Sequence, residues 1–454
     1  MTKRYSLKFW LLFWGIAVVL LSLWFVFLES RRNPLAMLDK TAQLVPLTGG
    51  LGVATDLAHY MLQEDGKERT VLFLLQNNLE LRPGGGYLGT FGIVKVKDGH
   101  VTSQQVHNTN VFDGRVPHLY DPPYPMKETL GIPSWQMRDS NYAPDFPTNA
   151  LKAEEFYKLG GGSENFDAII AVNANVLSTI LDITGPITLP GILGTYSSEN
   201  ALLQLEHQVE KAYYKQGINE GDRKVVVNDL AKIIVERISK LSLQEKIALP
   251  NRVAKHLSNK DIQILFKDKE LQQRVIEKGW DGAVDTAWQK DYLMIVDANL
   301  SSLKSDYHVK RAIDYYVDFS KGIPEATLRI TYTHTAKQKD WMTRDYQTFL
   351  RVYVPEKAWF VETTGNISKP VYGESFGKKY TGFLVHVPLG ETRMVELRYN
   401  LPLNFKGVSA YDLMIQKQSG VYDVPVVVTV VEAQGTKRKD SFVLNEDTIV
   451  SEIR

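Results

Sequence analysis

Two short segments of the chain carry charged side chains of the kinds that bind phosphate and metal ions. The first reads QNNLELRPGGGYLGTFG and carries Arg82 directly before Pro83 and three consecutive glycines. Glycine lets backbone N–H groups approach a ligand closely, and the forked guanidinium group suits a phosphate or a carboxylate. The alternative interpretation is a wide hairpin turn with a surface arginine.

The second segment is WQMRDSNYAPDFP, over residues 135–147, and it places Arg138, Asp139 and Asp145 among aromatic residues and prolines. It has no helical or strand periodicity, and ordered loops of this length and composition often carry function. The alternative is a structural loop in which the aspartates accept hydrogen bonds from their own backbone. We favour a functional loop.

A third charged segment, GDRK at residues 221–224, opens a stretch with helical periodicity. Arg223 would lie in the first turn, where the helix dipole and the free N–H groups already favour an anion. Asp222 is most simply the N-cap of that helix. The alternative for Arg223 is a solvated side chain without a ligand.

Three other motif matches do not fit their usual structural contexts. The G-x-G-x-x-G match at residues 84–89 runs into the strand-like FGIVKVK, whereas a dinucleotide site needs a helix there. The G-x-S-x-G match at residues 373–377 lies in a strand-rich region, whereas a nucleophile elbow joins a strand to a helix. The nine histidines are scattered without metal-ligand spacing, so we expect no histidine metal site.

The composition excludes several classes of protein. Of 454 residues, 53 are Lys or Arg and 52 are Asp or Glu, so a net charge of +1 gives no electrostatic case for nucleic acid. The 44% of apolar residues is typical of a globular chain rather than a disordered one. The absence of cysteine excludes disulfides, cysteine catalysis, iron–sulfur clusters and thiolate zinc sites.

The N-terminus predicts a membrane anchor. Residues 9–28 are 20 consecutive residues without a charge, which as a helix would span roughly 30 Å, the thickness of the bilayer hydrocarbon. Lys3, Arg4 and Lys8 precede this run, so residues 1–8 are predicted as a cytoplasmic tail and the bulk of the chain as extracytoplasmic. A cleaved signal peptide is the alternative, but no small-x-small cleavage site follows the run.

The remaining chain divides by its periodicity. Residues 29–68 are predicted as a juxtamembrane stalk. Residues 69–317 alternate strand-like runs (TVLFLLQ, FGIVKVK, DAIIAVN) with helical stripes such as Val226, Leu230 and Ile234, which predicts a layered α/β domain. From residue 318 to 454 the apolar residues alternate with period two, as in TLRITYTH, which predicts a C-terminal β-sandwich.

Several ordered motifs resemble one family. QNNLELRPGGGYLGTFG, RDSNYAPDFP, FDAIIAVNANVLSTILDITGPITL, and GWDG with DYLMIVDANLSSLKSD are similar to domain of unknown function 4012, over roughly residues 70–400. The family comprises membrane-anchored bacterial proteins with no established activity. The resemblance therefore implies an anchored protein without naming a reaction.

The order of the elements is also similar, more weakly, to the LytR-CpsA-Psr phosphotransferases. The likeness rests on the Arg-Asp pair at 138–139, on the segment GGGSENFDAIIAVNANVLSTILDITGP, and on Gly-Asp-Arg at 221–223. This chain departs from those enzymes after the first strand, where Asn77 and Asn78 stand in place of an acidic residue. It departs again at the helix start, which keeps only Arg223 and Lys224. The resemblance implies a layered mixed sheet with helices and a role in cell-envelope glycopolymer assembly.

The second resemblance also implies roles for the charged residues. Arg82, Arg138 and Arg223 would surround the pyrophosphate of a polyprenyl-linked glycan. Asp139 and Asp145 would hold Mg²⁺ or activate the acceptor hydroxyl as catalytic groups. An apolar helix face at residues 176–181 would line a groove for the lipid tail.

The expected function is therefore to bind a polyprenyl pyrophosphate-linked glycan at the bacterial cell membrane, or to transfer the glycan to a cell-wall polymer. The alternative is a non-enzymatic surface protein whose β-sandwich binds a partner or a cell-wall polymer.

Overall fold

The computed structural model describes Tyr60 and residues 63–192, 194–219, 225–242, 252–405 and 411–451. The predicted membrane span at 9–28 and Arg223 both lie outside these residues. Among the helices that are described, none has the length and apolarity needed to cross a bilayer. The chain divides into two compact units, of which one contains residues 1–69 and 95–102 and the other residues 70–94 and 103–454. In the first unit Lys95 pairs with Glu68. The rest of the description concerns the second unit.

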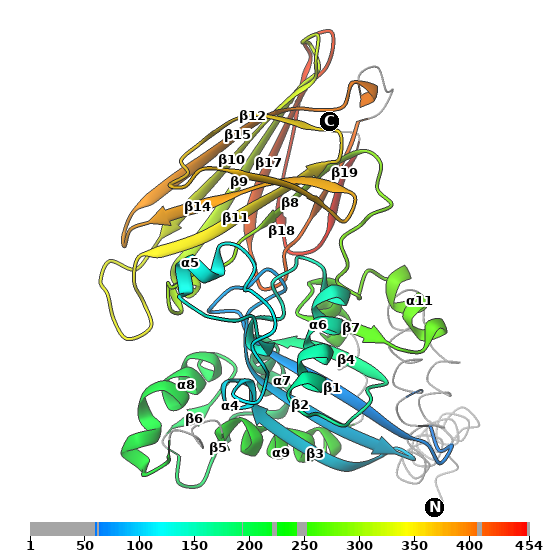
Figure 1. Cartoon of the computed structure of the whole chain (residues 1–454), viewed down its shortest axis with the longest axis vertical. Coiled ribbons are helices and arrows are strands. Elements are labelled where there is room, and N and C mark those ends of the chain that lie inside the picture. Colours follow the sequence, from blue (N-terminus) through cyan, green and yellow to red (C-terminus); the bar gives the residue numbers. More distant parts are fainter. Residues whose placement is uncertain are drawn as a thin grey trace, which may run out of the picture. The chain divides into compact units, whose positions relative to one another are not determined.

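A five-stranded sheet organises the first part of this unit (Figure 1). Its strands, in spatial order, are β3 (His100–Asn108), β2 (Tyr87–Lys97), β1 (Glu68–Asn77), β4 (Ala168–Asn173) and β7 (Ile262–Phe266). β1 and β4 are parallel, and Gln76 pairs in register with Asn173. The carboxyl ends of these two strands therefore meet at the same edge of the sheet.

Helices and short elements surround this sheet. They are α4 (Thr109–Asp113), α5 (Met126–Leu130), η1 (Met137–Asp139), α6 (Phe146–Leu159), α7 (Val176–Thr184), β5 (Ile187–Thr188), β6 (Thr195–Tyr196), α8 (Ala201–His207), η2 (Gln208–Ala212), η3 (Tyr213–Gln216), α9 (Val225–Ser239) and α11 (Lys269–Glu277).

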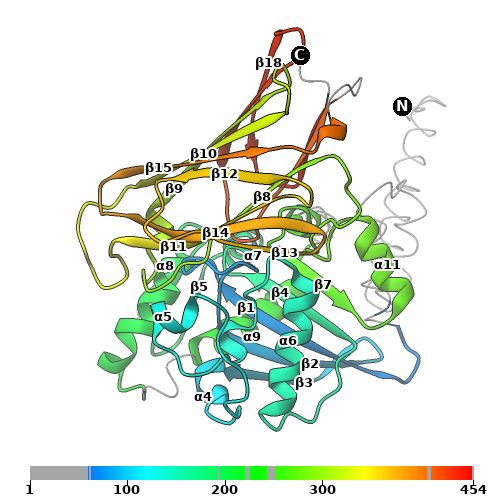
Figure 2. The same cartoon turned by 45° about the horizontal axis from the view of Figure 1, so that its top comes forward.

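The two faces of the sheet carry different helices because successive residues of a strand point to opposite sides. Leu72 and Leu74 of β1 share a core with Ala150, Ala153 and Phe156 of α6. Figures 1 and 2 show α6 lying over β1 and β4. The alternate residues of the same strands, Leu75 and Val172, lie instead on the side of α7 and α9.

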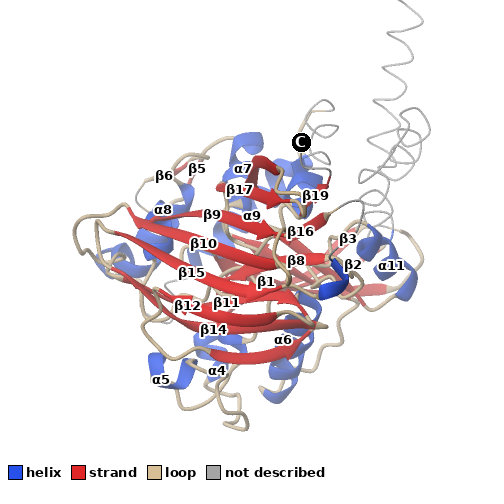
Figure 3. Cartoon of the chain, turned by 90° about the horizontal axis from the view of Figure 1, so that it is seen from above, coloured by secondary structure: helices blue, strands red, loops and turns tan. Residues whose placement is uncertain are grey.

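Two six-stranded sheets make up the rest of the unit, and Figure 3 shows β12, β15, β10, β9 and β17 side by side. One sheet consists, in spatial order, of β12 (Trp359–Thr364), β15 (Thr392–Asn400), β10 (Glu325–His334), β9 (Val309–Asp318), β17 (Val424–Val431) and β18 (Lys437–Leu444). The other consists of β13 (Val371–Ser375), β14 (Lys378–Val387), β11 (Tyr346–Pro355), β8 (Asp291–Val296), β16 (Asp412–Gln416) and β19 (Thr448–Ser451). The short helices η5 (Ser305–His308) and η6 (Leu403–Phe405) join strands.

The two six-stranded sheets share one hydrophobic core. Leu328, Ile330 and Tyr332 of β10 are buried in it, as their alternating pattern predicts, and Leu350 and Phe383 contribute from the other sheet. Each sheet contains a parallel pair, β9 with β17 and β8 with β16, so both are mixed. The chain is thus a mixed α/β protein with several mixed sheets and helices.

The sheets include residues that the sequence prediction assigned to the preceding α/β part. The predicted boundary lies at residue 318, whereas β8 begins at Asp291 and β9 at Val309. β8 is a central strand, and five of its six residues are buried, so its sequence DYLMIV shows no alternation. A fully buried strand cannot be assigned to a sheet by its periodicity alone.

Candidate functional site

Arg82 belongs to a buried cluster that we call the polar junction, together with Glu80, Asp139 and Asn299. The guanidinium Nε lies 3.3 Å from Asp139 Oδ1 and Nη2 lies 3.1 Å from Glu80 Oε1. Nη1 donates to the carbonyl oxygen of Asn299 at 2.9 Å. Arg82 is only 2% exposed. Each arm of this guanidinium therefore already has a partner within the protein.

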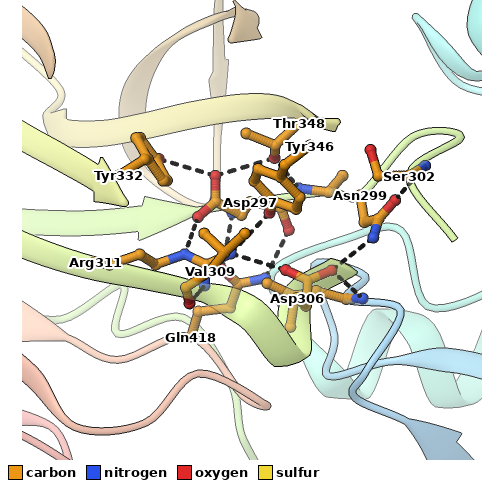
Figure 4. A network of polar contacts seen from close by, with 12 residues as sticks. Asp297, Asn299, Ser302, Asp306, Val309, Arg311, Tyr332, Tyr346, Thr348 and Gln418 are labelled. Carbon is orange, nitrogen blue, oxygen red and sulfur yellow. Dashed lines mark hydrogen bonds and ion pairs between the residues drawn. The ribbon is translucent and has the colours of Figure 1, made fainter. Parts of the chain in front are cut away.

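A second buried arginine, Arg311, extends the polar junction into the two six-stranded sheets (Figure 4). Its Nε lies 2.7 Å from Asp297 Oδ2, and its Nη2 lies 2.9 Å from Asp306 Oδ1. Asp297 Oδ1 also accepts hydrogen bonds from the hydroxyls of Tyr332 and Thr348. A buried ion pair is tolerated only when its remaining hydrogen-bonding capacity is satisfied, and here it is.

Backbone and amide hydrogen bonds tie the loop after β1 to these sheets. The N–H of Leu81 donates to Asp306 Oδ2 at 3.1 Å, and the N–H of Asn299 donates to the carbonyl of Leu81 at 2.9 Å. Gln418 Nε2 donates to the carbonyl of Arg82 at 3.1 Å. These hydrogen bonds connect the motif QNNLELRPGGG to the motif DANLSSLKSD, although more than two hundred residues separate them.

The three consecutive glycines approach the protein itself. A Cβ atom on Gly85 would lie 2.0 Å from Gln76 Oε1, and the φ angle of Gly85 is +138°. A Cβ on Gly86 would lie 2.3 Å from the backbone of Asn77, and one on Gly84 would lie 2.4 Å from Asn149 Nδ2. Only glycine allows these close approaches. The sequence interpretation identified the close approach, but its partner is the protein's own amide groups.

The structure brings three of the predicted site residues together, because Asp139 lies between Arg82 and Arg138. Asp139 Oδ2 lies 3.9 Å from Arg138 Nε, and that nitrogen lies 3.4 Å from Asp113 Oδ2. Arg138 also donates to Gln136 Oε1 at 2.6 Å. Burial raises the pKa of Asp113 to about 6, although Arg138 acts in the opposite direction.

Asp145 is the N-cap of α6. Its Oδ2 accepts hydrogen bonds from the N–H and the hydroxyl of Thr148, and its Oδ1 accepts from the N–H of Val284. The oxygens of Asp139 face two arginines, and those of Asp145 face N–H and O–H donors. This arrangement does not fit a Mg²⁺ site built on the two aspartates. In the described part of the chain, no group of three or more His, Asp or Glu side chains could hold a metal ion.

A cavity of about 550 Å³ opens at the carboxyl ends of β1 and β4. Apolar side chains from α7, η2, α8 and α9 form much of its wall: Val176, Leu177, Ile180, Leu205, Val209, Val227, Leu230 and Ile234. Ligands of open α/β sheets bind outside the carboxyl ends of the strands, and this cavity lies at that edge. The helix face predicted at residues 176–181 contributes three of these side chains.

Tyr87 links the cavity to the polar junction. Its ring lines the cavity, and the guanidinium carbon of Arg82 lies 5.4 Å from the ring centroid. Its hydroxyl donates to Asn110 Oδ1 at 2.6 Å. Burial raises the pKa of Tyr87, and Asp139 and Glu80 raise it further. Arg82 therefore lies next to Tyr87 and does not itself line the cavity.

The polar part of the cavity wall has its own charges. Lys304 Nζ lies 3.3 Å from Glu206 Oε2 and 3.7 Å from Glu210 Oε1, and Asn77 Nδ2 donates to Glu206 Oε1 at 2.9 Å. Burial raises the pKa of Glu206, with Lys304 acting against it. Burial lowers the pKa of Lys304, but Glu206, Glu80 and Glu210 raise it more, so the net shift is upward.

Two buried amides on the cavity wall have atoms without hydrogen-bond partners among the described residues. Among the described residues, neither Nε2 nor Oε1 of Gln76 has a hydrogen-bond partner, and Oδ1 of Asn173 also has none. The two side chains are 2% and 1% exposed. A buried polar atom without a partner costs about 1–3 kcal/mol, and Gln76 Oε1 and Asn173 Oδ1 lie against the backbone of Gly85.

Sequence reasoning did not single out Gln76, Asn173, Glu206 or Lys304. The available signal was a polar residue ending each of two buried strands, TVLFLLQ and DAIIAVN. It became informative only once the strands were known to be parallel neighbours, because that pairing places the two amides side by side.

Known structures resemble the chain only weakly. A proposed nutrient-binding protein from Legionella pneumophila is 8% identical over 30% of this chain and 54% of its own length, with a TM-score of 0.22. A fragment of a proposed transcriptional factor from Listeria monocytogenes is 12% identical over 47% of this chain and 77% of the fragment. A Listeria innocua protein is 12% identical over 48% and 80%, and both Listeria proteins give a TM-score of 0.27. These TM-scores are too low to establish a shared fold.

The family comparison covers the first part of the α/β region. No curated protein matches the chain. Residues 66–209 match the family described as "Protein of unknown function (DUF4012)", which is the family that the sequence motifs predicted. This segment contains β1, β4, the glycine loop and the RDSNYAP loop. The chain therefore contains a segment, residues 66–209, that matches the DUF4012 family of proteins of unknown function.

Proposed function

We propose that this protein is a membrane-anchored, extracytoplasmic component of cell-envelope glycopolymer assembly that binds a polyprenyl-linked glycan, with the polyprenyl chain in the cavity at the ends of β1 and β4. The observation that carries the proposal is the cavity itself, which has a volume of about 550 Å³ and a wall formed largely by apolar helix faces. This volume lies within the roughly 300–1,000 Å³ typical of ligand pockets.

The composition of the wall supports an amphipathic ligand. Each methylene group that leaves water for the faces of α7 and α9 contributes about 0.8 kcal/mol to binding. The polar part of the wall supplies the ammonium group of Lys304, for which a phosphate-bearing head group would compete with Glu206 and Glu210.

The side-chain contacts favour binding of the glycan over its transfer to an acceptor. Arg82, one of the cations expected around the pyrophosphate, is already held by Glu80 and Asp139. Asp145, one of the expected catalytic carboxylates, caps α6. The proposal includes residues 9–28 as a membrane span with the N-terminus in the cytoplasm, a LytR-CpsA-Psr-like α/β region, and a β-sandwich formed by the two six-stranded sheets.

The test is a thermal-shift titration of the full chain in detergent with farnesyl pyrophosphate. A ligand that binds only the folded state stabilises it by about 2.7 kcal/mol at a hundredfold excess over the dissociation constant. We expect a rise in the melting temperature that Leu177→Trp abolishes, because the indole would fill the cavity. Ile276→Trp on α11, where the side chain is exposed, is the matched control and should respond like the wild type.

Two probes separate the parts of the ligand. Inorganic pyrophosphate lacks the lipid chain that fills the cavity, so it should stabilise the protein little. Farnesol keeps the chain but lacks the charged head group, so its stabilisation should be intermediate. Equal stabilisation by pyrophosphate and farnesyl pyrophosphate would contradict the role of the cavity. No response to any of the three probes would favour the alternative of a non-enzymatic surface protein that binds a partner or a cell-wall polymer.

A further inference from the structure

A second hollow, which we call the aromatic groove, lies between the α/β region and one of the six-stranded sheets. Its volume is about 270 Å³, and its lining includes Trp135, Tyr142, Lys152, Arg351, Tyr353 and Tyr380. Lys152 belongs to α6, Arg351 and Tyr353 to β11, and Tyr380 to β14. The groove shares no lining residue with the 550 Å³ cavity.

Arg351 is partly buried in this groove, and no carboxylate of the described residues pairs with it. Its Nη2 donates to the carbonyl of Tyr142 at 2.8 Å, and its Nη1 donates to the hydroxyl of Tyr353 at 3.3 Å. In the part of the chain that the structure describes, Nε has no hydrogen-bond partner. The guanidinium carbon lies 4.9 Å from the centroid of the Tyr142 ring. The two terminal nitrogens carry four N–H groups, more than these two hydrogen bonds use, and the planar guanidinium fork matches a carboxylate or a phosphate.

Lys152 adds a second positive charge. Its Nζ lies 5.1 Å from the centroid of the Trp135 ring and pairs with Glu155 at 2.6 Å. Glu155 does not line the groove, and none of the lining residues is an aspartate or a glutamate. The lining is therefore cationic overall, which favours an anionic occupant.

The remaining lining is suited to a sugar ring. The indole N–H of Trp135 donates to the carbonyl of Asp139 at 2.8 Å, and the ring also contacts Lys152 and Phe156. Phe376 and Tyr380 are also partly exposed in the groove. Sugar rings present apolar C–H faces to aromatic rings and hydroxyl groups at their edges. Ser140 and Ser375 contribute hydroxyls, and among the described residues the buried Ser140 Oγ has no partner.

We infer that the aromatic groove binds a saccharide that carries a carboxylate or phosphate group, with Arg351 contacting the anion and the aromatic rings stacking on the sugar. Arg351 and Lys152 supply charge complementarity, and the rings and hydroxyls supply the contacts to an uncharged ring. The inference does not depend on lipid binding in the cavity, because the two sites have separate walls.

The test is isothermal titration calorimetry on the full chain in detergent, without lipid ligand. The probes are trigalacturonic acid, glucose 6-phosphate, the uncharged maltotriose, inorganic phosphate and AMP. We expect one of the two anionic saccharides to bind, and to bind about tenfold or more tightly than maltotriose, since a hydrogen bond to a charged group contributes about 1.5–3 kcal/mol. Which of the two binds more tightly distinguishes a carboxylate from a phosphate as the anion.

Arg351→Gln is the decisive variant, and Arg329→Gln, which removes an exposed arginine of the same pair of sheets, is its matched control. Arg351→Gln should weaken binding of the anionic saccharide about tenfold or more, and should lower the melting temperature only modestly, because the hydrogen bonds to Tyr142 and Tyr353 are lost but no ion pair is broken. Arg351→Lys, which keeps the charge but not the fork, should recover part of the affinity and serves as a second variant if Arg351→Gln does not fold.

Four results would overturn the inference. The first is no binding of either anionic saccharide. The second is binding that Arg329→Gln weakens as much as Arg351→Gln. The third is inorganic phosphate binding as tightly as the saccharides, which would show an anion site without sugar recognition. The fourth is tighter binding of AMP, which would assign the groove to a nucleotide.

Discussion

The polar junction and the aromatic groove each contain an arginine that stacks on a tyrosine, yet they supply it with different partners. In the junction, Arg82 lies over Tyr87 and meets the carboxylates of Glu80 and Asp139. In the groove, Arg351 lies over Tyr142 and meets only a carbonyl and a hydroxyl. The comparison shows that the type of residue does not determine its role. A guanidinium whose donors are used internally stabilises the fold, whereas one with spare donors can bind a ligand.

The largest expected effect comes from substituting Arg311, which removes a cation from the polar junction. Arg311→Met would leave Asp297 and Asp306 buried without their cation, which should cost about 3–5 kcal/mol of the free energy of unfolding. Urea denaturation measures this loss. Arg329→Met, at an exposed ion pair with Glu396, should cost only about 0–1 kcal/mol. Similar losses for the two variants would contradict a structural role for the junction.

The second prediction concerns a buried acid, Asp291, that has no cationic partner. Burial raises its pKa to about 6, although the hydroxyls of Tyr411 and Tyr315 and the N–H of Tyr292 act against this shift. The pKa of Asp291 is higher in the folded state than in the unfolded state. Its contribution to the free energy of unfolding should therefore be largest below about pH 4 and decrease by on the order of 2–3 kcal/mol as the pH rises to about 6.

Urea denaturation of the wild type and of Asp291→Asn between pH 4 and pH 6 checks this prediction. The stability of the wild type relative to the variant should decrease across that range, because the amide does not ionise. Parallel pH profiles would mean that Asp291 does not titrate in this range.

The third prediction concerns the glycine loop between the junction and the cavity. Gly85→Ala should cost about 2 kcal/mol, since the added methyl would clash with Gln76 and Asn173 and the φ angle is positive. Gly322→Ala is the control, because a Cβ there would meet no atom within 4 Å. Thermal denaturation of both variants measures the difference. Equal melting temperatures would show that the loop can move away from the amides.

The smallest predicted effect distinguishes the N-cap from the metal-site interpretation of Asp145. Asp145→Ala should cost about 1 kcal/mol, whereas Asp145→Ser, which keeps a capping oxygen, should restore most of the stability. Thermal denaturation with and without Mg²⁺ measures both effects. A stabilisation of the wild type by Mg²⁺ that is absent from Asp145→Ser would instead support a metal ligand.

The sequence motifs pointed to segments whose charged residues the structure brings together, and the catalytic and binding roles of those residues stay a prediction. The grouping of Arg82, Arg138 and Asp139 followed from two conspicuous loops, and the structure does place these three side chains together. Their contacts with Glu80, Asp113 and Asn299 could not be predicted, because a side chain's partners lie far away in sequence. The same applies to Arg351, which lies in a mostly buried strand and carries no local signal.

Local patterns by themselves determined the strands TVLFLLQ and DAIIAVN, the alternating strand TLRITYTH, the buried stripe of α9 and the family of residues 66–209. Periodicity records which face of an element is buried, and that information is local. The tertiary structure alone decided which strands are neighbours, that Gln76 and Asn173 meet at the cavity, and that Arg82 is neutralised whereas Arg351 is not. These outcomes depend on distances between distant segments, which are set only when the sheets and helices pack.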